Sequence, residues 1–303
     1  MMKTLVVRPG ALGDTILILP FLNTIASQDP EGSLWFLGTR AYLTLLPPNV
    51  EARPVDDVSS LWLFEKSVCN IEHPDFVFDT AYLILNSPSV VERNLIRTGT
   101  RNVKLVSPHG NNDQHIVTVL HRQAGLPEPP RVPTLSHLAK KGKLSAVWFH
   151  PGSGGPTKCA PISLFLSLGR LLNRYFNLPC VVTASEQDSF LASEQEWHSL
   201  LALPGTRLFM NRPLLELCRD LGGAVLFIGN DSGIAHLAAG LGVKSLLFFC
   251  VTDPRRWVPW APLNQISIID CRHSAPPIEY VWQKLCALLD AGSTNGETGD
   301  TGD

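Results

Sequence analysis

The sequence predicts an α/β protein built of two Rossmann-like domains, whose parallel sheets face a cleft. A strand–loop–helix pattern opens the chain at Lys3 and begins again at Ala146, after a proline-rich stretch. The expected strands are continuous apolar runs, as in sheets that helices cover on both faces. A glycine-containing loop follows the first strand of each half, and open α/β sheets bind ligands beyond the carboxyl ends of their strands. We therefore expect a ligand site in the cleft.

Composition limits the class of protein. A chain of 303 residues is long enough for two domains, and 45% hydrophobic with 17% charged residues is typical of a globular protein. The net charge of −2 argues against nucleic-acid binding. We expect no signal peptide and no membrane span, because no apolar run reaches about 20 residues. Seven cysteines without metal-ligand spacing predict mostly buried, reduced thiols in a cytoplasmic protein with no bound metal.

The first strand, residues 3–8, leads into the loop GALGD at 10–14 and a helix from Thr15. Asp14 falls at or near the helix N-cap, so spacing alone leaves open whether it caps the helix or does chemistry. The loop lacks the GxGxxG pattern of a dinucleotide site. The next strand, 33–37, ends without the carboxylate that would bind an adenosine ribose. This pattern disfavours an NAD-dependent redox enzyme.

Further strands are expected at 75–79 and 102–106. Between them lies a basic cluster, either a solvated face or a site for a phosphorylated acceptor. Its members are Arg93 and Arg97 on a predicted helix, then Arg101 and Lys104 in the following turn. Four prolines at 127–133 and three lysines at 140–143 indicate a linker. We place an N-terminal domain at 1–133, a linker at 134–144, a C-terminal domain at 145–275, a terminal helix at 276–290 and a disordered tail at 291–303.

The second half begins with a strand at 146–149, a glycine-rich loop at 150–158 and a helix at 161–172 with proline in its first turn. Backbone N–H groups of such a loop can approach a diphosphate closely, and Lys158 would add a point charge. The loop is not a Walker motif, because no GK[ST] follows its glycines at the required spacing.

A third loop follows the apolar run 224–228. Its turn, GNDSG at 229–233, leads directly into an Ala/Leu-rich helix. Asp231, Ser232 and His236 gather around this helix start. Unpaired N–H groups and the helix dipole favour an anion there, so we predict a phosphate or sugar-phosphate site. A further strand at 244–249 and a loop at 251–257 complete the domain.

Three motifs, in this order, resemble glycosyltransferase family 9, the ADP-heptose:lipopolysaccharide heptosyltransferases. They are GALGD at 10–14, HPGS at 150–153 with Lys158, and GNDSG at 229–233 with His236; the loop TDPRRW at 252–257 also fits. The resemblance covers residues 3–262. It implies a GT-B fold, inverting transfer without metal or other cofactor, an ADP-sugar donor bound by the C-terminal domain, and a glycan or lipid-linked acceptor bound by the N-terminal domain. A lipid-linked acceptor would bring this cytoplasmic protein to the inner face of the inner membrane.

The resemblance also implies residue roles. Asp14 matches the family's catalytic base. The implied donor contacts are Ser153 and Lys158 at the diphosphate, Ser232, Gly233 and His236 completing that site, Asp231 at sugar hydroxyls, and Glu186 at the adenosine ribose. Arg93, Arg97 and Arg101 fall where the family binds the acidic inner core. From the residues alone, His236 could instead fill a helix face, and Glu186 could be an ordinary first-turn carboxylate.

The chain departs from the family pattern at two places near the expected donor. Cys159-Ala160 follows Lys158 where relatives carry an aromatic residue, and Cys250-Val251 replaces a Gly-Pro before the Thr-Asp-Pro loop. Two other classes of function remain open at this point. They are a nucleotide-sugar epimerase or hydrolase of the same fold, and a non-catalytic nucleotide-sugar binding module.

Overall fold

The computed structural model describes residues 1–67, 74–109, 113–139, 146–184 and 193–290. The chain divides into two compact units, Met1–Pro130 (unit 1) and Arg131–Asp303 (unit 2). Within the expected linker, residues 136–138 form a 3₁₀ turn. The rest of that linker beyond Ala139, the predicted tail at 291–303 and the candidate Glu186 lie outside the described residues.

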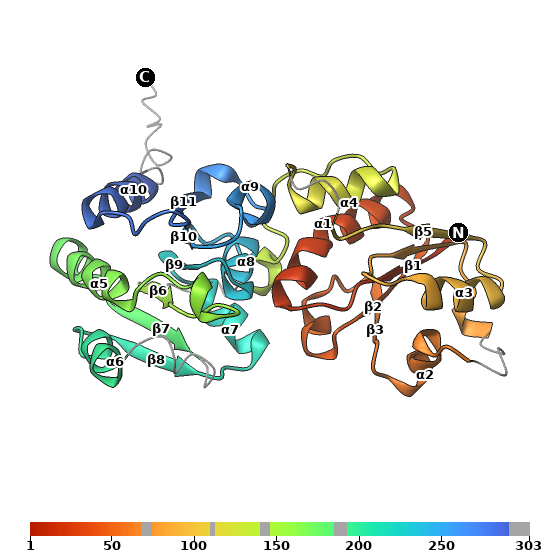
Figure 1. Cartoon of the computed structure of the whole chain (residues 1–303), viewed down its shortest axis with the longest axis horizontal. Coiled ribbons are helices and arrows are strands. Elements are labelled where there is room, and N and C mark those ends of the chain that lie inside the picture. The colour runs from red at the N-terminus through yellow and green to blue at the C-terminus, as the bar shows by residue number, and fades with distance from the viewer. Residues whose placement is uncertain (68–73, 110–112, 140–145, 185–192, 291–303) are drawn as a thin grey trace, which may run out of the picture. The chain divides into compact units, whose positions relative to one another are not determined.

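Unit 1 contains a five-stranded parallel sheet in the order β3-β2-β1-β4-β5 (Figure 1). Its strands are β1 Lys3–Val7, β2 Ser33–Gly38, β3 Val50–Pro54, β4 Thr80–Leu83 and β5 Asn102–Leu105. Its α-helices are α1 Leu12–Gln28, α2 Val58–Leu61, α3 Ser89–Arg97 and α4 Ile116–Ala124. Every strand runs in the same direction, so the loops after β1, β2 and β4 emerge at one edge of the sheet.

The prediction of a strand at 75–79 is wrong. Residues 74–76 form a 3₁₀ turn and β4 begins only at Thr80. Phe76 and Phe78 instead pack edge-to-face in an aromatic cluster with Trp35. The Asp79 carboxylate accepts hydrogen bonds from the Lys3 backbone N–H and from Arg101. Burial of aromatic rings outside the sheet produced the same apolar pattern that a strand would have.

Unit 2 contains a six-stranded parallel sheet in the order β11-β10-β9-β6-β7-β8. Its strands are β6 Val147–His150, β7 Cys180–Ala184, β8 Arg207–Met210, β9 Leu226–Asn230, β10 Ser245–Phe249 and β11 Ile266–Asp270. Its α-helices are α5 Ile162–Phe176, α6 Glu194–Leu201, α7 Leu214–Leu221, α8 Gly233–Gly240, α9 Pro254–Trp257 and α10 Ile278–Asp290. Because β9 lies between β6 and β10, the three loops after these strands are neighbours.

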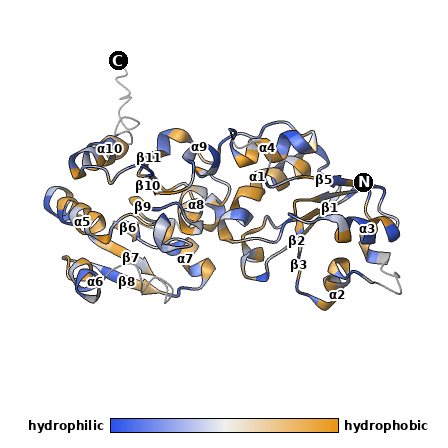
Figure 2. Cartoon of the chain, in the orientation of Figure 1, coloured by the Kyte–Doolittle hydropathy of each residue, from blue (hydrophilic) through white to orange (hydrophobic). Residues whose placement is uncertain are grey.

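The cores explain why these segments are strands and helices. Hydrophobic residues run along much of both sheets and the covering faces of helices (Figure 2). In α5, Ile162, Phe165, Leu168 and Leu172 are buried at helical spacing and pack in one cluster with Phe149 of β6 and Phe248 of β10. Burial on both faces agrees with the continuous apolar runs of the strands. No helix in the described ranges is both long and apolar enough to cross a lipid bilayer.

Candidate functional site

Asn230, the last residue of β9, connects two loops of unit 2. Its side chain is fully buried; Nδ2 donates to the Pro151 carbonyl at 2.6 Å, and Oδ1 accepts from the Ala160 N–H at 2.9 Å. One side chain therefore fixes both ends of the loop that carries Lys158. Sequence reasoning missed this role, although a polar residue at the end of an apolar strand was the available signal.

Replacing Asn230 by alanine is expected to lower the free energy of unfolding by about 2–4 kcal/mol, because a buried carbonyl and a buried N–H lose their partner. Urea denaturation of both proteins measures the change. The matched control is Asn264→Ala, an exposed asparagine of the same unit, for which we expect a change below about 0.5 kcal/mol. An Asn230→Ala protein as stable as the wild type would show that the loop does not depend on this side chain.

Asp231 is the centre of a polar cluster in unit 2. Its Oδ2 accepts from Thr252 Oγ1 at 2.5 Å, and its Oδ1 lies 3.9 Å from His236 Nε2. Its backbone carbonyl accepts from Ser153 Oγ at 2.6 Å, and its N–H donates to the Phe248 carbonyl. The loops after β6, β9 and β10 are thus joined at one residue. Ser153, Asp231 and His236, which sequence reasoning grouped, are brought together, and Thr252 joins them.

The start of α8 lies beside this cluster. Ser232 is the N-cap, and its hydroxyl accepts from the Ala235 N–H at 3.2 Å. Ser232 and Gly233 are partly exposed, whereas His236, one turn further, is 5% exposed. A helix start with partly exposed first residues can receive an anion. Gly229 is required just before it, because a Cβ there would lie 2.9 Å from the His150 carbonyl oxygen.

Lys158 ends a short 3₁₀ turn, Pro156–Lys158, in the loop that Asn230 anchors. Its side chain is half-buried, and no acidic residue in the described ranges forms an ion pair with it. The ammonium group is therefore the available cation of the loop.

The Asp253 carboxylate, in contrast to the Lys158 ammonium, already interacts with charged side chains. It caps α9, and the Arg255 guanidinium hydrogen-bonded to it lowers the pKa of its carboxyl to about 2. Arg272 lies 3.6 Å from the same carboxylate. These contacts hold the loop after β10 in one shape and leave Thr252 directed at Asp231.

In unit 1, Asp14 is the third residue of α1, not its N-cap. Its Oδ2 accepts from the Ala11 N–H at 3.1 Å, and its Oδ1 accepts from Arg8 Nη2 at 2.6 Å. Asp14 thus serves the helix start and also pairs with a cation at the end of β1. The Arg8 side chain is 13% exposed and that of Asp14 29%. Sequence reasoning missed Arg8, whose only signal was a charge directly after a buried strand.

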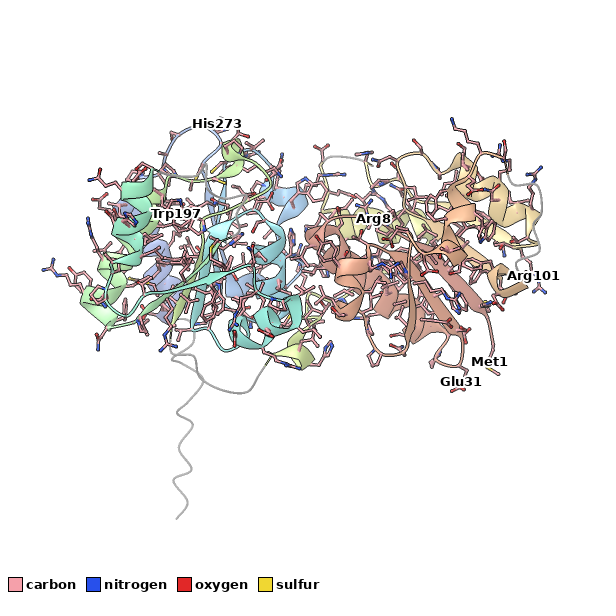
Figure 3. All side chains as sticks on the ribbon, turned by 90° about the horizontal axis from the view of Figure 1, so that it is seen from below. Met1, Arg8, Glu31, Arg101, Trp197 and His273 are labelled. Carbon is pink, nitrogen blue, oxygen red and sulfur yellow. The ribbon has the colours of Figure 1, made fainter. Side chains whose placement is uncertain are left out.

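The three candidate acceptor arginines of unit 1 lie on α3 and directly before β5. Arg93 donates to the Lys66 carbonyl at 2.8 Å, and Arg97 is the last residue of α3. Arg101 pairs with Asp79 at 2.7 Å, directly before β4 and β5. The amino ends of the strands are opposite the edge that carries the loop of Asp14, so the structure does not bring Arg101 and Asp14 together. Figure 3 labels Arg101 and Arg8, the partner of Asp14, well apart on unit 1.

Residues 102–280 match glycosyltransferase family 9 (heptosyltransferase). The chain belongs to this family. The matched range contains every strand of unit 2 and begins at β5 of unit 1, so the loop of Asp14 precedes it. No curated protein matches the sequence.

Solved structures show the same fold at low identity. Escherichia coli heptosyltransferase WaaC, solved with ADP, is 15% identical with a TM-score of 0.70 over 94% of this chain and 99% of that one. A glycosyltransferase family 9 protein of Veillonella parvula is 14% identical with a TM-score of 0.70 over 95% and 97%. E. coli ADP-heptose lipopolysaccharide heptosyltransferase II is 17% identical with a TM-score of 0.68 over 95% and 98%. The expected α/β class with two parallel sheets, the GT-B architecture, is confirmed.

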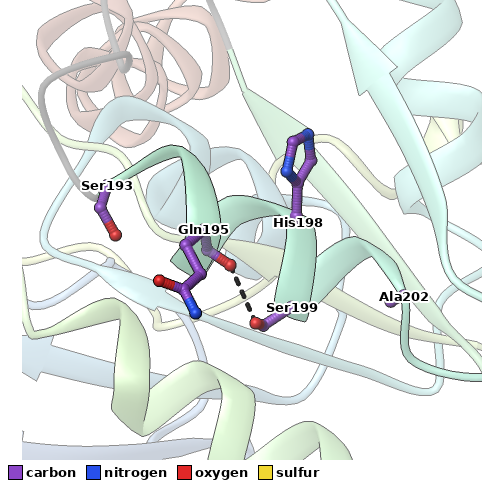
Figure 4. A pocket seen from close by; sticks show the side chains of 5 residues that line it. All are labelled: Ser193, Gln195, His198, Ser199 and Ala202. Carbon is purple, nitrogen blue, oxygen red and sulfur yellow. Dashed lines mark hydrogen bonds between the residues drawn. The ribbon is translucent and has the colours of Figure 1, made fainter.

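A separate surface hollow of this family 9 glycosyltransferase lies against α6 (Figure 4). Its lining residues are Ser193, Gln195, His198, Ser199 and Ala202. Ser199 Oγ donates to the Gln195 carbonyl at 2.8 Å, within the helix itself. None of the loops after β6, β9 or β10 contributes to the hollow, so we assign it no part in the site.

Proposed function

We propose that this family 9 glycosyltransferase transfers a heptose, or a related sugar, from an ADP-sugar to a lipopolysaccharide inner core or another glycan, with inversion at C1 and without a metal ion. The observation that carries the proposal is the polar cluster of unit 2, where Ser153, Asp231 and His236 meet beside the start of α8. The heptosyltransferase WaaC was solved with ADP and with ADP-2-deoxy-2-fluoro heptose. A nucleoside diphosphate has the charge and size that such a helix start accepts.

Cleavage of the donor requires groups that stabilise the negative charge on the leaving ADP. As the bond between C1 and the diphosphate oxygen breaks, positive charge develops on the sugar ring and negative charge on the leaving ADP. Lys158 and the amides of Ser232 and Gly233 supply the opposing charge and hydrogen bonds, with His236 beside them. Preorganised donors of this kind replace a metal ion, and the anchoring of the lysine loop by Asn230 keeps them in position.

The acceptor half needs a base. We assign Asp14 to take the proton from the acceptor hydroxyl as its oxygen attacks C1 on the face opposite ADP, which inverts the anomeric centre. Arg8 and the Ala11 N–H each use one lone pair of this carboxylate, so accepting capacity remains for a substrate proton. An acidic glycan also needs cations, and Arg93 and Arg97 remain our candidates for that contact, whereas Arg101 lies at the edge of the sheet opposite to Asp14. A lipid-linked acceptor would place the enzyme at the cytoplasmic face of a membrane.

A thermal-shift screen of nucleotides tests the donor assignment. A ligand at about 100 times its Kd adds ~2.7 kcal/mol to the free energy of unfolding. We expect ADP and ADP-sugars to raise the melting temperature and UDP and GDP forms to leave it unchanged. No response to any nucleotide would contradict the proposal.

A release assay then separates transfer from the two alternatives. A transferase releases ADP only when acceptor is present, a hydrolase releases ADP without acceptor, and a binding module releases none. We expect acceptor-dependent release that persists in EDTA, and NMR of the product should show inverted anomeric configuration.

Gly10→Ala is expected to lower kcat by about 10- to 100-fold, because displacing a reacting group by about 1 Å has an effect of that size. A Cβ at Gly10 would lie 2.7 Å from Asp14 Cβ and 2.8 Å from Asp14 Oδ2, so the carboxylate must move. Steady-state kinetics measure the loss, and the Kd for ADP, a property of unit 2, serves as the internal control. An unchanged kcat would show that the position of Asp14 is not critical.

A further inference from the structure

Two cysteines lie side by side where neighbouring strands of unit 2 end. The register of β10 and β11 pairs Phe249 with Asp270, so the next residues, Cys250 and Cys271, follow as opposite neighbours. The Cys271 N–H donates to the Phe249 carbonyl at 2.8 Å, which continues the ladder to this point. The pairing is invisible in sequence, where the two residues are far apart.

Both thiols project to the same side of the sheet. Cys250 lies two positions beyond Phe248, and Cys271 two positions beyond Ile269. Since side chains alternate along a strand, each cysteine shares the face of that buried neighbour. All four residues belong to or pack against one hydrophobic cluster. The Cys271 thiol donates to the Ile269 carbonyl at 3.6 Å.

The two thiols are unequal. Interaction with Cys271 lowers the pKa of the Cys250 thiol, whereas interaction with Cys250 and burial raise the pKa of Cys271. Cys250 is therefore the better thiolate, and Cys271 holds the proton. Both residues are half-buried, and Val251 directly after Cys250 is 53% exposed, so the pair lies close to the protein surface. Cys180 and Cys218 differ, because they are fully buried and burial raises the pKa of each to about 11.

The backbone spacing suits a covalent bond. Adjacent strands lie about 4.8 Å apart, and a disulfide requires Cα atoms about 4.4–6.8 Å apart. We propose that Cys250 and Cys271 form a dithiol site that a small-molecule disulfide oxidises to an intramolecular disulfide. The Cys250 thiolate attacks one sulfur of the reagent and expels a first thiolate. Cys271 then gives up its proton and attacks the Cys250 sulfur, which releases the second thiol; two protein thiols are oxidised and one disulfide is reduced.

The disulfide would close a loop from Cys250 to Cys271. Residues of this loop contact the polar cluster around Asp231. Thr252, two residues after Cys250, donates to Asp231, and Arg272, directly after Cys271, lies 3.6 Å from the Asp253 carboxylate. Cross-linking the two ends of this segment reduces the conformational freedom of the unfolded chain. The oxidised protein is therefore expected to melt at a higher temperature than the reduced one.

The test treats the reduced full-length chain with oxidised glutathione, alkylates the remaining thiols and reads intact mass and peptide maps. We expect two thiols to be lost without retained glutathione, and a peptide that links Cys250 to Cys271. In Cys271→Ser the resolving thiol is absent, so Cys250 should retain one glutathione. In Cys250→Ser the reaction of Cys271 should slow by about tenfold or more, because the better thiolate is gone.

Cys180→Ser is the matched control and should cross-link like the wild type. Stable glutathione on Cys250 of the wild-type chain, or a linkage to any other cysteine, would overturn the proposal. So would two unreacted thiols at 250 and 271 under conditions in which the half-buried Cys286 reacts. These readouts do not use sugar transfer, so they are independent of the proposed donor and acceptor.

Discussion

Asp14→Asn is expected to lower kcat for sugar transfer by about 10²- to 10⁴-fold, the usual contribution of a general base. The amide cannot take the acceptor proton, although its oxygen can still accept from the Ala11 N–H as Asp14 does at 3.1 Å. The Kd for ADP should stay within about twofold, since all the proposed donor contacts lie in unit 2. Steady-state kinetics and calorimetric titration with ADP measure the two quantities separately.

A second helix start in unit 1 provides the control. Asp57 caps α2, where its side chain accepts from the Ser59 N–H at 3.0 Å. Asn is an equally good N-cap, so Asp57→Asn should keep both activity and fold. Substantial transfer by Asp14→Asn would remove Asp14 from the role of base. Loss of activity in both variants would point to a general effect of changing a carboxylate at a helix start.

Lys158→Ala is expected to lower kcat by about 10²- to 10³-fold and to weaken ADP binding, because the proposed mechanism then loses the cation that opposes the developing charge on the leaving group. The half-buried ammonium forms no ion pair with the acidic residues described above, so its removal leaves no orphaned partner in the fold. The free energy of unfolding should therefore remain close to that of the wild type. Steady-state kinetics measure kcat, calorimetric titration measures the Kd for ADP, and urea denaturation measures the free energy of unfolding.

Charge and position are separated by two further variants. Lys158→Arg keeps the charge and should recover part of the loss in ADP affinity, though not the geometry of a compact ammonium. Lys284→Ala removes an exposed lysine of α10 and should have no effect on transfer. If Lys158→Ala transferred sugar at the wild-type rate, groups other than Lys158 would have to stabilise the negative charge on the leaving group.

Much of the fold was predictable because its strands are buried on both faces. Continuous apolar runs marked β1, β2, β6, β9 and β10 within one or two residues of their observed bounds. The strand predicted at 75–79 was wrong because Phe76 and Phe78 are buried against Trp35 ahead of β4, which begins only at Thr80. Apolar content reports burial, and only backbone pairing distinguishes a strand from a packed turn.

The candidate site, like the fold, was predictable only in part. Asp231, Ser232 and His236 were grouped by sequence because they lie within one turn of a single helix start. Ser153 was linked to them through resemblance, and its hydrogen bond to the Asp231 carbonyl required the strand order that places β6 beside β9. Asn230 was missed as the residue that anchors the lysine loop, because both of its partners are about 70–80 positions away in sequence.

By itself the sequence determined the local units: which segments are strands, which loops follow them, and which loops carry glycine, lysine and carboxylate. These depend on periodicity and turn chemistry within a few residues. Only the tertiary structure decided which distant residues meet. It paired Arg8 with Asp14, set Arg101 at the edge opposite to Asp14, and placed Cys250 beside Cys271. The physical reason is that strand order and register are set by packing of the whole sheet, which no short segment encodes.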